Sequence, residues 1–224
     1  MAITPPDPRP AYQAILRRFI PPAAVEIMAD WVLRYNFDLR ITEPRASKFG
    51  DYTSPSKHQR HRISINHNLN PYAFLITLVH EVAHLATFDK YAIIVHRIKP
   101  HGIEWKGEFQ RLIQPFLHDG VFPPDVLHAL RNYMENPAAT SCTDVHLQRV
   151  LRRHNQHPSA EVHLEELPYK SLFKTNSQRL FEKGTRQRVR FLCTELSTRR
   201  QYLFHPLTEV MPVEQTLFGL EGEG

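Results

Sequence analysis

The chain has 224 residues, of which 42% are hydrophobic and 23% charged, and its formal net charge is +5. That length is enough for one sizeable core and a small second unit, and no run of about 18 apolar residues suggests a transmembrane helix. Two cysteines, Cys142 and Cys193, exclude a disulfide framework and a four-cysteine zinc site. We therefore expect a globular cytoplasmic protein with no membrane association, and its basic balance favours an acidic partner such as nucleic acid.

The first part of the chain predicts two helices followed by three short strands. Residues 11–19 and 23–36 are amphipathic, and a pair of prolines precedes the second of these helices. The next segments alternate apolar and polar side chains in part and are punctuated by proline and glycine. We expect them to form one small antiparallel sheet. The three expected strands are residues 37–42, 45–53 and 61–66.

A buried helix is predicted over residues 72–88, after Asn70 as a capping residue and a helix-opening proline. His80, Glu81 and His84 interrupt its apolar sequence. The helical repeat places the two histidines one turn apart on one face, where both can reach one divalent ion with the glutamate beside them. In zinc hydrolases with this HExxH pattern, the metal takes three protein ligands and the glutamate accepts the proton of a water molecule. The alternative is a chance occurrence of the pattern on a core helix.

A catalytic zinc site needs a third protein ligand from elsewhere in the chain. His101 is the leading candidate, because Gly102 allows a tight turn beside the metal and Trp105 can wall the site one turn later. Lys90 stands where the longer zinc-protease pattern requires a further histidine. The alternative ligands are Glu104, Glu108 and His96. Three histidines upstream of the helix are expected to be solvated: His58, His61 and His67.

Helices are also predicted downstream of Gly102. Residues 154–168 are polar and unperiodic, which is typical of a linker. The segments beyond it alternate in the manner of strands and predict a small β-rich unit. The expected helices are residues 103–117, 124–134 and 143–155, and the expected β segments are residues 179–196 and 199–213.

The motif HEVAH at residues 80–84, followed by HGIEWK at residues 101–106, resembles the SprT-like family, to which the Spartan proteases also belong. The similarity extends over about residues 23–117, and the HGxxW part is the more specific half. The resemblance implies a zincin-like α+β domain that binds one zinc ion. For Spartan-type members it also implies proteolysis of proteins bound or crosslinked to DNA, as in DNA repair. The ligands it implies are His80, His84 and His101, with Glu81 as the catalytic base.

Many bacterial SprT-like proteins carry a C-terminal zinc ribbon with four cysteines, whereas this chain keeps only Cys193 there. We therefore expect a degenerate, cysteine-poor ribbon-like β unit. Residues 170–200 contain nine Lys or Arg and two Glu, a local net charge of +7. The candidate nucleic-acid contacts are Arg186, Arg188, Arg190, Arg199 and Arg200. The first three alternate on one expected strand and would share a face, with Val189 and Phe191 packed inward.

The sequence thus predicts a zinc-dependent metallopeptidase acting on a protein substrate, which would add a strand to the edge of the small sheet. One alternative is a non-catalytic DNA-binding module that keeps zinc for folding. Another is hydrolysis of a small amide at the same centre. The expected divisions of the chain are residues 1–137 as the SprT-like domain, 138–168 as a helix and linker, 169–213 as the basic β-rich unit, and 214–224 as a tail.

Overall fold

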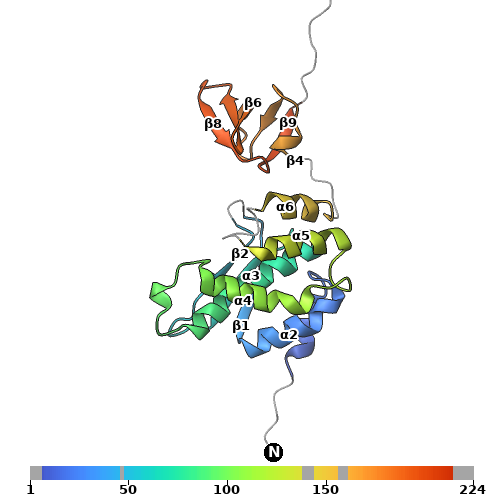
Figure 1. Cartoon of the computed structure of the whole chain (residues 1–224), viewed down its shortest axis with the longest axis vertical. Helices are drawn as coiled ribbons and strands as arrows, with labels where there is room; N and C mark the ends of the chain where they lie inside the picture. Colours follow the sequence, from blue (N-terminus) through green and yellow to red (C-terminus); the bar gives the residue numbers. More distant parts are fainter. Residues whose placement is uncertain (1–6, 46–47, 138–143, 156–160, 214–224) are drawn as a thin grey trace, which may run out of the picture. The chain divides into compact units, whose positions relative to one another are not determined.

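The computed structural model describes residues 7–45, 48–137, 144–155 and 161–213. The fold is mixed α+β, as the sequence predicted. The chain divides into two compact units, residues 1–156 and residues 157–224, and each has a hydrophobic core of its own. Figure 1 shows a helix-rich first unit with a small sheet, and a second unit made of strands.

Two amphipathic helices, α1 (Arg9–Leu16) and α2 (Val25–Arg34), open the first unit. Val25, Met28 and Val32 recur at helical spacing on α2, and all three are buried. This apolar face fixes α2 against the core. The helix predicted over this segment is confirmed, with each end two residues shorter than expected.

The small sheet consists of β1 (Phe37–Thr42), β2 (Gly50–Thr53) and β3 (His61–Asn66), in the order β1-β3-β2. The prediction that the whole sheet is antiparallel is wrong, because β1 and β3 pair in parallel and only β2 runs antiparallel to β3. The chain reverses direction between β1 and β2 and again between β2 and β3, so β3 runs in the same direction as β1. Ile63 and Ile65 of the central strand are fully buried. The strand β2 is left at an edge of the sheet.

The helix α3 (Pro71–Lys90) is the central helix of the first unit, and fourteen of its residues are buried. A helix that is apolar nearly all round requires such a position. The Asn70 side chain caps it by accepting hydrogen bonds from the backbone N–H groups of Tyr72 (3.1 Å) and Ala73 (2.9 Å). The Asn70 amide also donates to the carbonyl of Leu151 at 2.7 Å. The predicted cap and helix start are therefore confirmed.

The helices α4 (Ile103–Ile113), α5 (Pro124–Glu135) and α6 (Val145–Arg152) complete the first unit. In Figure 1, α4 packs along α3, and α6 packs against α5. The predicted helix over 103–117 ends earlier and continues as a short 3-10 turn at Pro115, whose nitrogen has no proton to donate. Among the described residues, no helix is both long and apolar enough to cross a lipid bilayer.

The second unit is β-rich, as predicted. Its strands form a six-stranded antiparallel sheet in the order β4-β9-β5-β6-β7-β8. Phe173, Phe181 and Cys193 are buried at its core, so the thiol serves as a small apolar group. The strands are β4 (Val162–His163), β5 (Leu172–Lys174), β6 (Leu180–Gln187), β7 (Arg190–Glu195), β8 (Gln201–Phe204) and β9 (Glu209–Val213).

The segment predicted as a linker, residues 154–168, differs in part from that expectation. Val162 and His163 form β4 and pair with Val210 and Glu209 of β9. The next residue, Leu164, is fully buried in the core of the second unit. Long-range pairing therefore gives regular structure to a segment whose own sequence has no periodicity. The predicted tail, residues 214–224, lies outside the described residues.

Replacing Asn70 with alanine is expected to lower the free energy of unfolding of the first unit by about 1–3 kcal/mol. The change removes the cap of α3 and the amide that donates to Leu151. Urea denaturation followed by circular dichroism measures the effect. The matched control is N132A on the exposed surface of α5, expected to stay within about 0.5 kcal/mol of wild type. A wild-type unfolding curve for N70A would contradict the role of the cap.

Candidate metal centre

Two imidazoles on α3 form the base of the candidate site. His80 and His84 lie one helical turn apart, and their ring centroids are 5.1 Å from each other. His80 is 5% exposed, and the helix around it is almost wholly apolar. Burying polar rings in such surroundings is costly unless their nitrogens find partners. The ring nitrogens of His80 and His84 therefore need polar partners from another part of the chain.

His101, at the start of α4, brings a third imidazole to the same place. Its backbone φ is +60°, in the left-handed region that residues other than glycine adopt rarely and at a cost. A hydrogen bond of 2.8 Å from the Gly102 N–H to the Lys99 carbonyl closes the turn. A Cβ at Gly102 would lie 2.9 Å from that carbonyl oxygen. The predicted tight turn is therefore present, with glycine needed for space and the strain carried by His101.

The Nε2 atoms of the three rings converge. His101 Nε2 lies 2.9 Å from His84 Nε2 and 3.2 Å from His80 Nε2, and the three donor atoms are all within 4.8 Å of one another. A neutral imidazole nitrogen offers one proton or one lone pair, so hydrogen bonding can satisfy only one of the two contacts of His101. Nitrogen ligands about 2.0–2.1 Å from a tetrahedral zinc ion are about 3.3–3.4 Å apart. The residues present therefore fit one divalent ion that accepts all three lone pairs.

The surroundings keep these imidazoles neutral, which is the form that binds a metal. Burial, followed by the proximity of the other two rings, lowers the pKa of His80 well below its ordinary value. Burial and the neighbouring His101 lower the pKa of His84 to about 3, and burial lowers the pKa of His101 as well. The Nδ1 atom of His80 is buried with no hydrogen-bond partner among the described residues. The Nε2 atom of His80 is thus the ring nitrogen that can make a strong polar interaction.

The Trp105 indole closes one side of the centre, as predicted. Its ring centroid is 4.6 Å from that of His80, 5.3 Å from that of His84 and 4.7 Å from that of His101. Trp105 itself is 1% exposed. Because a large apolar ring lies against all three imidazoles, water is excluded from that side and the local dielectric is lowered.

Glu81 lies next to the histidine pair and is 6% exposed. Burial, and then the charge of Asp51, raises the pKa of Glu81 to about 8. Arg45, Lys48 and a backbone hydrogen bond from Tyr52 act in the opposite direction. A divalent cation at the adjacent imidazoles would also favour the ionised carboxylate. The protonation of this glutamate is therefore tied to occupation of the metal centre.

The ligands that competed with His101 lie elsewhere. Glu108 is buried in ion pairs with Lys90 (2.7 Å) and Arg111 (2.6 Å). Burial raises the pKa of Glu108, but the hydrogen bonds from these two cations outweigh it, and the net change is downward. Glu104 and His96 are not part of the histidine group. The ligand ranked first from the sequence is thus the one brought to the two helical histidines.

An ionic cluster beside β2 was not found from the sequence. The guanidinium of Arg45 hydrogen-bonds to the Asp51 carboxylate, to Ser64 Oγ at 3.1 Å and to Asn66 Oδ1 at 2.9 Å. Ser64 and Asn66 are buried polar side chains on β3. The cluster depends on the pairing of β2 with β3, which no local pattern specifies. In the sequence, the alternation of polar residues with isoleucines along β3 was the one feature that indicated this ionic cluster.

His61 also differs from its expected place in a solvated loop. It begins β3 and is partly buried, with the Tyr52 hydroxyl 2.9 Å from its Nδ1 atom and Asp89 3.3 Å from its Nε2 atom. His58 and His67 are exposed, as predicted.

The five candidate nucleic-acid contacts do not form one patch. Arg186, Arg188 and Arg190 lie at the tip of the hairpin between β6 and β7, whereas Arg199 and Arg200 lie in the turn before β8. The six residues of β7 separate the two turns. At about 3.3 Å per residue, the turns are roughly 17 Å apart along the strand.

The single strand predicted through residues 186–190 is wrong. The chain turns there, with Arg188 at a φ of +51°, and β6 and β7 pair as an antiparallel hairpin. Val189 is 66% exposed at the turn, in contrast to its expected inward packing. Phe191 packs against the core of the second unit, as expected.

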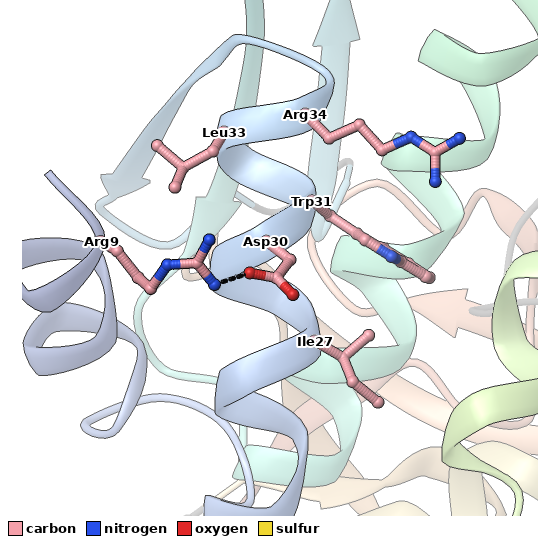
Figure 2. Close-up of a pocket in the computed structure, with 6 residues that line it drawn as sticks. All are labelled: Arg9, Ile27, Asp30, Trp31, Leu33 and Arg34. Atoms are coloured by element: carbon pink, nitrogen blue, oxygen red, sulfur yellow. Dashed lines mark hydrogen bonds and ion pairs between the residues drawn. The ribbon is translucent and has the colours of Figure 1, made fainter. Parts of the chain in front are cut away.

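A separate hollow of about 540 Å³ lies between α1 and α2 (Figure 2). An ion pair between Arg9 and Asp30 crosses it, and its other lining residues include Trp31. None of its lining residues belongs to the metal centre. The three histidines and Glu81 are therefore not among the residues that line this hollow.

No protein-family model matches the chain, and no curated protein or solved structure matches it either. The likeness to the SprT-like family therefore rests on the HEVAH and HGIEWK motifs, whose histidines lie together in the structure. Membership of that family stays a prediction.

Purified protein is expected to bind one zinc ion per chain. His101→Ala should weaken zinc binding by more than the ~10–100-fold that losing an outer hydrogen-bond partner of a ligand costs, because it removes a direct donor. Chelator competition combined with elemental analysis measures the affinity. The matched control is H96A, since His96 is exposed on the same connecting segment. Wild-type zinc affinity in H101A would exclude His101 as a ligand.

Proposed function

We propose that this chain is a zinc-dependent metallopeptidase of the SprT-like type, which hydrolyses peptide bonds in protein substrates. The observation that carries the proposal is the convergence of three neutral imidazole nitrogens beside a buried glutamate. Three protein ligands leave one position of a tetrahedral zinc ion open, which distinguishes catalytic sites from closed structural sites.

His80, His84 and His101 would hold the zinc ion, which would supply Lewis acidity to polarise a carbonyl group and lower the pKa of water. Glu81 accepts the proton of the attacking water at a carboxylate oxygen and then delivers it to the leaving amine nitrogen. The carboxylate has to be ionised for the first transfer, and a nearby divalent charge favours that form despite burial. Trp105 keeps bulk water from competing on its side of the site.

The sheet edge supports a polypeptide substrate in preference to a small amide. β2 pairs with β3 on one side and is an edge strand of the small sheet, so an extended peptide can pair with the other side. Gly50 of β2 lies directly against Glu81, because a Cβ at this glycine would be 3.1 Å from Glu81 Cγ. A peptide added to this strand would therefore run past the catalytic base.

Glu81→Gln is expected to keep one zinc ion per chain and to lower the rate of protein cleavage by about 10²–10⁴-fold, the usual contribution of a general base. Cleavage of an unfolded protein, and of a DNA-bound protein, is followed by gel electrophoresis alongside zinc analysis. The matched control is E104Q, which changes a neighbouring carboxylate outside the histidine group. Cleavage by E81Q at the wild-type rate would remove Glu81 from its role.

A zinc-containing DNA-binding module is the second candidate, and the β6–β7 hairpin favours it. All residues from 185 to 190 are exposed there, including three arginines. Exposed guanidinium groups bind phosphate oxygens without regard to base sequence. In this case zinc would support folding alone, and the wild-type chain would bind DNA without cleaving protein.

The triple variant R186A/R188A/R190A, made in the full chain, is expected to bind duplex DNA more weakly and with a shallower salt dependence. Removing one arginine–phosphate pair reduces the steepness of log K against log salt by about 0.9. Fluorescence anisotropy over a salt series measures both quantities. R199A/R200A, in the other turn, is the comparison and should change binding less. Equal losses of affinity in the two variants would assign binding to diffuse charge instead of the hairpin.

A further inference from the structure

Strand β2 lies along α3 with almost no space between them at Glu81. A Cβ built on Gly50 would be 2.8 Å from Thr77 Cγ2, 2.8 Å from Ile65 Cδ1 and 3.1 Å from Glu81 Cγ. Contacts under 3.0 Å require something to shift, so a side chain at this position would have to displace those of Ile65 and Thr77. Thr77 and Glu81 are one turn apart on α3 and define the face against which the strand packs.

The next residue on the same face of β2 is Tyr52, which contacts Glu81 through its backbone. The Tyr52 N–H hydrogen-bonds to the Glu81 carboxylate. A hydrogen bond from a main-chain donor restricts the directions in which a carboxylate can point. Such a donor can orient the Glu81 carboxylate only if strand β2 is itself held in place.

The Tyr52 side chain anchors the strand to α3 at a second point. Its hydroxyl lies 2.9 Å from His61 Nδ1, and His61 Nε2 lies 3.3 Å from Asp89. The Tyr52 and His61 rings stack with centroids 5.9 Å apart, and Phe88 packs against both. Burial, with the charge of Asp89 adding to it, raises the pKa of Tyr52, which keeps the phenol protonated.

This series of contacts begins at Glu81 on α3, passes through β2 and His61, and returns to α3 at Asp89. Glu81 and Asp89 are eight residues apart on α3, or about 12 Å at 1.5 Å per residue. Between them, β2 is held by the close approach at Gly50 and by the chain of contacts through Tyr52 and His61. The strand is therefore fixed in position along α3 on both sides of its bond to the carboxylate.

We propose that Gly50 and Tyr52 are positioning residues for Glu81, and that β2 holds the carboxylate in the orientation needed for proton transfer. The inference rests on the proposed peptidase function. It goes beyond that function by assigning a role to the Asp89–His61–Tyr52 contacts, which take no part in metal binding. Their purpose is to keep one backbone N–H aimed at the catalytic base.

Gly50→Ala tests the close approach. The added methyl group should displace Glu81 and lower kcat by about 10- to 100-fold, as misplacement by about 1 Å does elsewhere. KM should stay within about twofold, and zinc affinity by chelator competition should not change. Adding I65V and T77S removes the two methyl groups closer than 3.0 Å to the new Cβ, which gives the methyl group room to move away from Glu81, so the triple variant should regain part of kcat. I65V/T77S alone is the control.

Tyr52→Phe tests the side-chain anchor without adding bulk, and it decides the matter if G50A fails to fold. It should lower kcat by about 2- to 10-fold, the effect of one hydrogen bond, with KM and zinc affinity unchanged. Y12F, a partly buried tyrosine on α1, should behave as wild type.

The outcomes distinguish a failure of the proposed peptidase function from a failure of the positioning role alone. If zinc-loaded wild-type protein cleaves nothing, the peptidase function and this inference both fail. If wild type cleaves and both G50A and Y52F match its kcat, the positioning role alone fails. A loss of zinc affinity in step with kcat would also overturn it, because the strand would then support the fold of the metal centre and not the carboxylate.

Discussion

Three imidazole nitrogens gathered within 4.8 Å of one another beside a buried apolar helix are the constraint on which the rest of this structure depends. Lone pairs repel one another unless a proton or a cation lies between them, and His101 Nε2 faces two such neighbours at 2.9 and 3.2 Å. The chain bears two further costs to bring them together: the burial of His80 and the positive φ of His101. A divalent ion bound at this point would offset those costs.

The surrounding elements hold the ligand-bearing helices in register. Buried Glu108 on α4 pairs with the exposed side chains of Lys90 at the end of α3 and Arg111 on its own helix, and a buried carboxylate left without its cations is costly. This cluster fixes α4, and with it His101, relative to α3. On the other side, β2 packs against Glu81. The contacts of α4 thus support His101, and β2 supports the side chain of Glu81.

The sequence predicts the parts of this site that depend on local signals. The cap at Asn70, the helical repeat and the turn at Gly102 were sufficient to assign α3 and the histidine set. The direction of β1 and the contacts of β2 with α3 depend on pairing between distant segments, which local patterns do not specify. The hairpin at Arg188 was missed because its positive φ is carried by arginine, where glycine or asparagine usually marks such a turn.

X-ray absorption spectroscopy at the zinc edge of the purified protein tests the central claim most directly. The histidine centre predicts one zinc ion per chain with three imidazole nitrogens at about 2.0–2.1 Å and one further light atom. A sulfur neighbour near about 2.3 Å, or zinc scattering without an imidazole contribution, would contradict it.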